Sequence, residues 1–329
     1  MPVSNLAKPG VHKVAREPER GYNQACQRYR RLIGGYPRFA DDSLRVGGGP
    51  AQGGWLALLV EAERNLDLGS FDATQDSVDE YLDSVGDGLS IYKETGFAPP
   101  LYSAASALGA LLRELALPPG AIHSLQEVKT LSPVAIGSSV KVSALVEKPR
   151  RRAGLEFITV VCSIESDGAL ALTSKSTVLV PSQDSPEATT KDAKVQEAEP
   201  LTSGLAAISK EIKQENLNAY AKASGDDNPL HLDPEFAAKT QFGGIIAHGM
   251  LTLAFVSEMM AAAHGRDWLE SGGLRVRFKG AAFLGDRVDV WGDLTKEDGR
   301  TRSYSVGIRN SASGQELISG TAGLTIQQG

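Results

Sequence analysis

The chain has 329 residues, enough for two domains of ordinary size or one duplicated domain with a sizeable buried core. Its 34 basic and 40 acidic residues give a net charge of −6, which argues against a general nucleic-acid binder, and its two cysteines lack the spacing of a disulfide framework or a zinc site. No apolar run approaches the ~20 residues that a membrane helix requires, and no secretory signal is visible. We therefore expect a soluble protein without a metal site, cytoplasmic or in an organelle matrix if the source is eukaryotic.

Residues 1–68 are predicted to be an N-terminal extension, whose structure the sequence does not make clear. Its first twenty residues are polar and contain three prolines, which is typical of an arm outside a packed core. A glycine-rich loop spans 47–54, and the apolar spacing of 55–66 predicts a helix. The loop lacks the lysine and the Ser/Thr of a phosphate-binding loop, so we interpret it as a plain turn.

From about residue 69 onward, the chain contains an internal duplication. The aligned segments share a tyrosine, a glycine and an aspartate, then a turn that leads into a strand, then two alternating strands around a hairpin glycine. The pairs are 81–87 with 220–226, 134–142 with 282–290, and 157–180 with 303–326, at offsets of 139, 148 and 146. Both copies are therefore predicted to have the same fold.

Each copy is predicted to contain an initial strand, a helical segment, a longer helix and several long antiparallel strands. The longer helices are predicted at 104–115 and 250–263, apolar over most of their surface and therefore buried. A curved antiparallel sheet around one central helix is the hotdog fold, so we predict an α+β chain with a double hotdog. The predicted boundaries are 69–181 for the first hotdog, 182–204 for a polar linker and 205–329 for the second hotdog.

The second copy carries two motifs with the groups that acid–base chemistry needs. Residues 224–231 read Ser-Gly-Asp-Asp-Asn-Pro-Leu-His, and the glycine and proline favour a tight turn that would bring Asp226, Asn228 and His231 together. Residues 247–251 read Ala-His-Gly-Met-Leu and open the predicted central helix. Together the two motifs closely resemble the signature of the MaoC-like, (R)-specific enoyl-CoA hydratases.

This resemblance implies a hydro-lyase that adds water to an acyl-CoA thioester, or removes it, with syn geometry. Asp226 and His231 would supply the acid and base functions around one water molecule, and Asn228 would orient the site through a hydrogen bond. The N–H of Gly249, at the start of the central helix, would stabilise the thioester oxyanion. No cofactor is expected. Without the motif, Asp226 would more often be a turn or N-cap residue and His231 a structural histidine.

The first copy lacks these groups and is predicted to be catalytically silent. Asp87 is followed by Gly-Leu-Ser-Ile-Tyr, without the Asn-Pro-Leu-His of the second copy. Residues 98–101 read Ala-Pro-Pro-Leu and take the place of 247–250, and the second of these prolines has no N–H to offer a developing negative charge. One active site per chain follows.

Basic side chains and one histidine are the candidates for binding the substrate. Arg275, Arg277 and Lys279 alternate along a predicted strand, so they share a face that would contact the CoA phosphates or remain solvated. The basic cluster 148–152 falls at a predicted hairpin tip, with the same two interpretations. His248 would line the substrate pocket or cap the central helix.

The predicted function is reversible hydration of a trans-2-enoyl thioester to the (3R)-hydroxyacyl thioester, by a homodimer or a pseudo-dimeric monomer. The expected partner is an acyl-CoA substrate rather than nucleic acid or a membrane. Two alternatives remain open. One is a tailoring dehydratase or isomerase that uses the same pair, Asp226 and His231, on a non-CoA substrate, and the other is a non-catalytic acyl-CoA-binding hotdog subunit. The intact pair disfavours the second alternative, because a binding module needs neither group.

Overall fold

The two copies fold into the same succession of a strand, helices and antiparallel strands, as the duplication predicts. The computed structural model describes residues 63–115, 121–152, 155–181 and 204–327, within one compact unit. The first copy contains β1 (Asn65–Asp72), α3 (Gln75–Val85), α4 (Ile91–Thr95), α5 (Pro100–Glu114), β2 (Ile122–Thr130), β3 (Ser139–Val146), β4 (Arg150–Arg152), β5 (Leu155–Ser166) and β6 (Ala169–Pro181). The second contains β7 (Ile208–Glu211), α6 (Gln214–Ser224), α7 (Pro234–Ala237), α8 (Gly249–His264), α9 (Arg266–Ser271), β8 (Gly273–Phe278), β9 (Arg287–Asp298), β10 (Thr301–Asn310) and β11 (Glu316–Thr325).

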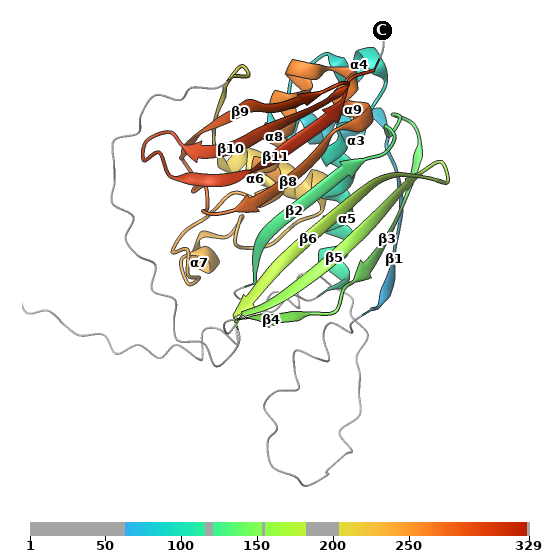
Figure 1. Ribbon diagram of the computed structural model, residues 1–329. Coiled ribbons are helices and arrows are strands. Elements are labelled where there is room, and N and C mark those ends of the chain that lie inside the picture. Colours follow the sequence, from blue (N-terminus) through green and yellow to red (C-terminus); the bar gives the residue numbers. More distant parts are fainter. Residues whose placement is uncertain (1–62, 116–120, 153–154, 182–203, 328–329) are drawn as a thin grey trace, which may run out of the picture. The chain divides into compact units, whose positions relative to one another are not determined.

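These strands belong to one sheet, in which the two copies meet side by side (Figure 1). The strand order is β1-β3-β5-β6-β2-β8-β11-β10-β9-β7, with β4 paired to β5. β2 of the first copy pairs antiparallel with β8 of the second, from Leu125 opposite Arg277 to Lys129 opposite Gly273. The double hotdog is confirmed, and the two predicted sheets are joined through this pair into a continuous 11-stranded sheet. The pairing satisfies backbone groups that would otherwise be exposed at two sheet edges.

The helices α3 and α6 end in the same way. Each stops at a glycine in the left-handed conformation, Gly86 with φ of 66° and Gly225 with φ of 75°. Glycine adopts this conformation without the steric penalty that a Cβ brings. The backbone therefore turns sharply after each helix, and Asp87 and Asp226 follow at equivalent positions.

The long helices α5 and α8 lie on one face of the sheet and form the core with it (Figure 1). α8 is buried along residues 250–261, as expected of a helix that is apolar on all sides. Alternate residues of β3, among them Val140 and Val142, are buried in the same core. Each large apolar side chain buried in this way contributes about 1.5–3 kcal/mol to folding.

Three local predictions need correction. Residues 65 and 66, predicted to end a helix, belong to β1, because their backbone pairs with β3. In the basic cluster 148–152, the last three residues form β4 against β5, so only the first two remain in a turn. α5 begins at Pro100, four residues before the predicted start, because proline suits the first position of a helix.

Other predictions lie outside the described residues. These are the arm, the glycine-rich loop and most of the helix within 1–62, and the linker except for its last residue. The boundary at residue 68 falls inside β1 and stays a prediction. Among the helices that the structure describes, none is long and apolar enough to cross a membrane.

Candidate active site

The turn after α6 brings the motif residues together through its own hydrogen bonds. The Asn228 side-chain oxygen accepts a hydrogen bond from the Leu230 N–H at 3.0 Å, and the His231 N–H donates to the Asn228 carbonyl at 3.0 Å. The Asn228 N–H donates to a carboxylate oxygen of Asp226 at 3.4 Å. Asn228 therefore shapes the turn that carries Asp226 and His231. Its role in orienting the reaction stays a prediction.

His231 is buried, and one nitrogen of its ring is engaged. Nδ1 lies 2.8 Å from the Ile246 carbonyl oxygen. A carbonyl can only accept, so Nδ1 carries the proton and Nε2 keeps a lone pair. Burial lowers the pKa of this imidazole, an effect that the neighbouring Asp226 carboxylate opposes. The His231 ring is therefore neutral at pH 7 and offers one free acceptor nitrogen.

His248 connects the start of α8 to the catalytic turn. It occupies the N-cap position of α8, as one of the two predictions for it had it, but its side chain makes no capping hydrogen bond. Its Nε2–H donates instead to the Asp226 carbonyl oxygen at 3.0 Å, and its ring centroid lies 3.9 Å from that of His231. Burial and then His231 lower the pKa of His248 to about 2, so its ring is uncharged at neutral pH. Pocket lining by His248 remains a proposal.

Asp226 completes a cluster of three titratable groups. Burial raises the pKa of its carboxyl, and His231, in its protonated form, opposes that shift. One potential ligand atom from each of Asp226, His231 and His248 lies within 4.8 Å of the other two. By distance alone these atoms could also hold a small cation, since two imidazoles and a carboxylate occur together at metal sites. The three groups are close enough to exchange a proton through a bound water or to share a cation.

Gly249 presents a backbone donor beside this cluster. It is the first residue of α8, so its N–H has no acceptor within the helix, and the helix terminus carries a partial positive charge. A Cβ at this position would lie 3.1 Å from a ring carbon of Phe278, so a larger residue would press on that ring. Phe278, at the end of β8, was not among the predicted site residues, because no local pattern places it against Gly249.

The start of α5 reproduces this backbone without the donor. The N-cap residue Pro99 has φ of −55° and ψ of 137°, and its counterpart His248 has φ of −58° and ψ of 133°. Pro100 then stands where α8 has Gly249. Because proline has no N–H, the first copy cannot offer an oxyanion donor at this position.

The first copy also keeps the aspartate and replaces its partner. Tyr92 follows Asp87 by five residues, as His231 follows Asp226, and its hydroxyl donates to the Asp87 carboxylate at 2.6 Å. The Leu89 N–H donates to the other carboxylate oxygen at 3.1 Å. Burial raises the pKa of the Tyr92 phenol well above 10, so this group is not a base at pH 7. Tyr92 was not predicted, although the offset of 139 maps His231 onto it.

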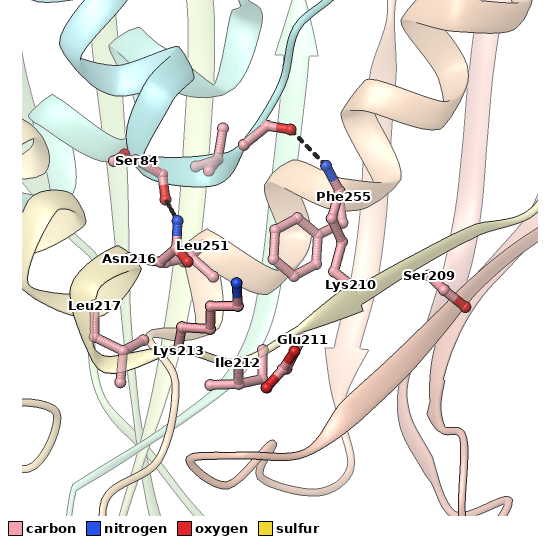
Figure 2. A pocket seen from close by; sticks show the side chains of 12 residues that line it. Ser84, Ser209, Lys210, Glu211, Ile212, Lys213, Asn216, Leu217, Leu251 and Phe255 are labelled. Carbon is pink, nitrogen blue, oxygen red and sulfur yellow. Dashed lines mark hydrogen bonds between the residues drawn. The ribbon is translucent and has the colours of Figure 1, made fainter.

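A cavity of about 230 Å³ lies beside the silent site, between the two copies (Figure 2). Its wall includes Gly86 and Lys210, and the Lys210 ammonium donates to the Gly86 carbonyl at 2.6 Å. The same ammonium pairs with Glu258 at 2.8 Å. Neither Asp226 nor His231 lines this cavity, so it is distinct from the candidate active site.

The three basic residues predicted to bind substrate lie on the exposed face of β8 and just beyond its end. Arg275 pairs with Glu127 at 2.9 Å, and Lys279 pairs with Glu316. Leu274 and Val276 of the same strand are buried in the core. The structure therefore does not bring Arg275, Arg277 and Lys279 into the cluster of titratable groups, and their contact with substrate stays a prediction.

Solved structures share this fold over most of the chain. One described as a MaoC-like dehydratase matches with a TM-score of 0.66 and 19% identity, over 83% of this chain and 100% of that chain. A conserved hypothetical protein of Mycobacterium tuberculosis with a double hotdog fold matches with a TM-score of 0.56 and 9% identity, over 81% of this chain and 96% of that chain. At these identities the likeness shows the fold alone. The chain is a double-hotdog protein with one Asp/His cluster in its second copy.

A family model and curated relatives are similar to part of this chain. The model of the MaoC like domain matches residues 189–315. The 3-hydroxybutyryl-CoA dehydratase of Methylorubrum extorquens is 32% identical over 130 residues, which are 36% of this chain and 81% of the relative. The (R)-specific enoyl-CoA hydratase of Aeromonas caviae is 33% identical over 123 residues, which are 34% of this chain and 90% of the relative. The chain therefore belongs to the MaoC-like dehydratase family, and the expectation of a hydro-lyase enzyme is confirmed.

Proposed function

We propose that this protein is an (R)-specific 2-enoyl-CoA hydratase, which in the reverse direction dehydrates a 3-hydroxyacyl-CoA. The observation that carries the proposal is the placement of Asp226 and His231 on one turn, tied by His248 to the start of α8. Membership of the family supports the reaction class. The names of the two relatives described above support CoA as the carrier and the R configuration of the product.

The route of proton transfer follows from the free Nε2 of His231 and from the position of Asp226 beside it. One water molecule would stand between Asp226 and His231, and the free Nε2 of His231 would accept a proton as the water oxygen bonds to C3. The electron pair of the C2–C3 double bond moves into an enolate on the thioester oxygen. The imidazolium, stabilised by the Asp226 carboxylate, then returns a proton to C2 on the same face. The elements of water are added with syn geometry, and the enzyme ends in its starting state.

The enolate charge requires a donor that is in place before the reaction. The N–H of Gly249 meets this need, because the helix leaves it without an acceptor and the end of α8 adds a partial positive charge. The lack of a Cβ lets a thioester approach this backbone closely.

The proposal is tested by following the loss of the conjugated thioester absorbance with crotonyl-CoA and longer enoyl-CoAs. Turnover that survives a chelator supports proton transfer by Asp226 and His231 without a metal. Tight binding of the enoyl-CoA without turnover would favour the non-catalytic subunit. Turnover only of substrates on another carrier would favour the tailoring enzyme.

We expect Asp87→Asn to leave kcat within a few-fold of wild type. The asparagine oxygen can still accept the hydrogen bond from the Tyr92 hydroxyl, and no imidazole stands beside Asp87 to share a proton. Steady-state kinetics with one enoyl-CoA, together with the melting temperature, measure the effect. A loss as large as that of Asp226→Asn would show that the first copy takes part in the chemistry.

Asp226→Asn should raise the melting temperature at pH 7. Burial raises the carboxyl pKa above 3.8, so folding favours the protonated form, and the folded state loses this advantage as the pH rises through the folded-state pKa. At pH 7 the folded wild type must either hold a buried negative charge or take up a proton that the unfolded chain does not bind, and asparagine has neither cost. Thermal unfolding at pH 4 and pH 7 checks the sign, because the gain should shrink at pH 4. A lower melting temperature at pH 7 would mean that the charge stabilises the fold.

A further inference from the structure

We propose that Tyr81, a residue of the silent copy, positions the candidate active site through Tyr220 and His248. Tyr81 and Tyr220 are counterparts in the duplication, and the helices that carry them, α3 and α6, pack against each other. The proposal rests on the proposed function only for its activity readout. The contacts that support it do not depend on the substrate.

Four aromatic rings form a row that crosses from the silent copy to the catalytic turn. The ring centroids are 6.1 Å apart for Tyr81 and Tyr220, 5.0 Å for Tyr220 and His248, and 3.9 Å for His248 and His231. The first three residues are 1% exposed and His231 is 8% exposed. A close-packed interior has no void to absorb a displacement, so a shift of one ring in the row moves the next.

His248 is the member of the row that passes such a shift to both reacting groups. Its Nε2–H holds the Asp226 carbonyl at 3.0 Å, and its ring lies against that of His231. These two contacts set the position of the carboxylate relative to the imidazole. A tilt of the His248 ring would therefore displace both groups.

The silent copy also reaches the catalytic turn through Ser224. The Ser224 hydroxyl donates to the Tyr220 carbonyl at 2.7 Å, and its oxygen accepts from the Asp226 N–H at 3.3 Å. A Cβ at Gly109, on α5 of the silent copy, would lie 2.0 Å from the Ser224 carbonyl oxygen. The backbone before Asp226 thus packs directly on the first copy. The row of rings that begins at Tyr81 is a second connection between the first copy and the turn that carries Asp226.

The ring of Tyr81, rather than its hydroxyl, carries this role. The hydroxyl is buried without a hydrogen-bond partner among the described residues, and burial raises its pKa, so it remains neutral. The ring of Tyr81 also contacts Tyr102, with centroids 5.7 Å apart, and Tyr102 in turn contacts Phe71. Tyr102 is 2% exposed, and both of these ring contacts lie within the silent copy. It is therefore the matched control for Tyr81.

The test compares Tyr81→Leu, Tyr81→Phe and Tyr102→Leu in the full-length protein. Tyr81→Leu should lower kcat about 10- to 100-fold and change KM by less than about threefold, because misplaced catalytic groups slow the chemical step. Tyr81→Phe keeps the ring and should retain at least about half of the wild-type kcat, since only an unpaired hydroxyl is lost. Tyr102→Leu should lower the melting temperature as Tyr81→Leu does, yet lower kcat much less than Tyr81→Leu, because Tyr102 contacts the Tyr81 ring and stands one ring further from the turn.

An unchanged kcat in Tyr81→Leu would overturn the proposal, as would an equal loss in Tyr102→Leu or in Tyr81→Phe. If the wild type turns over no enoyl thioester, the proposed function fails, and the nitrogen signals of the histidine rings in an NMR spectrum decide the inference instead. Tyr81→Leu should then shift the ring signals of His231 and His248, and Tyr102→Leu should shift them much less. Unshifted signals in Tyr81→Leu would contradict it.

Discussion

Asp226→Asn and His231→Ala should each lower kcat by at least about 10²-fold, the usual scale for a lost acid–base group. Asparagine keeps an oxygen for the Asn228 N–H but cannot place a negative charge beside the imidazole. Alanine removes the free Nε2 that would accept the proton of water, together with the Nδ1–H bond to the Ile246 carbonyl. Steady-state kinetics with an enoyl-CoA measure both losses.

The two variants have a control within the chain. Asp87→Asn makes the same chemical change at the equivalent position of the silent copy and should leave turnover nearly intact. The double variant of Asp226 and His231 should lose little more than either single variant, because groups that act as a unit are not additive. Near wild-type turnover in either single variant would contradict the assignment of the pair.

Gly249→Pro should lower kcat about 10²- to 10³-fold, which corresponds to roughly 2.7–4 kcal/mol of transition-state stabilisation for one oxyanion donor. The change removes the N–H while keeping the helix start, because α5 begins with Pro100 after an N-cap of almost the same φ and ψ. The ψ of 133° at His248 also suits a residue that precedes proline. The measurement compares kcat and KM with those of the wild type.

Gly249→Ala is the paired variant, because it keeps the N–H. Its methyl group would meet the Phe278 ring at 3.1 Å, so that ring must move by a few tenths of an ångström. We expect a smaller loss than for proline, and Phe278→Leu should relieve it. Equal losses in the alanine and proline variants, with KM raised and kcat preserved, would show that Gly249 serves close approach of the substrate and not oxyanion binding.

The order of the elements and the residues of the turn that carries Asp226 and His231 follow from local patterns. Both could therefore be predicted from the sequence. Gly86 and Gly225 each end a helix and place an aspartate after it, so the duplicated Tyr-Gly-Asp spacing predicts two equivalent turns. The alternation of apolar residues predicts the strand pairs β5–β6 and β10–β11, whose partners are neighbours in the chain. Local sequence predicts the structure of a residue well where the main contacts of that residue are with neighbours in the chain.

Contacts between segments that are far apart in the chain could not be predicted from the sequence. Residues 65 and 66 have apolar spacing that suits a helix, but pairing of β1 with β3 makes them a strand. The sequence alone predicts that Arg275 could bind a phosphate. In the structure, β2 places Glu127 opposite Arg275, and the two side chains form an ion pair. The ring contact between Tyr220 and His248 requires the N-cap of α8 to lie against α6, which no periodicity encodes. Each of these features arises from tertiary structure that overrides or adds to local preference.

Chiral analysis of the product that the wild-type protein forms from crotonyl-CoA tests the central claim most directly. One water held between Asp226 and His231 would attack a single face of C3, so the expected product is (3R)-3-hydroxybutyryl-CoA alone, formed with loss of the conjugated thioester absorbance. A racemic product would contradict hydration from one fixed face, and a (3S) product would contradict the (R)-specific assignment. No loss of absorbance, even with enzyme equal in amount to substrate and with longer enoyl chains, would contradict the hydratase assignment itself.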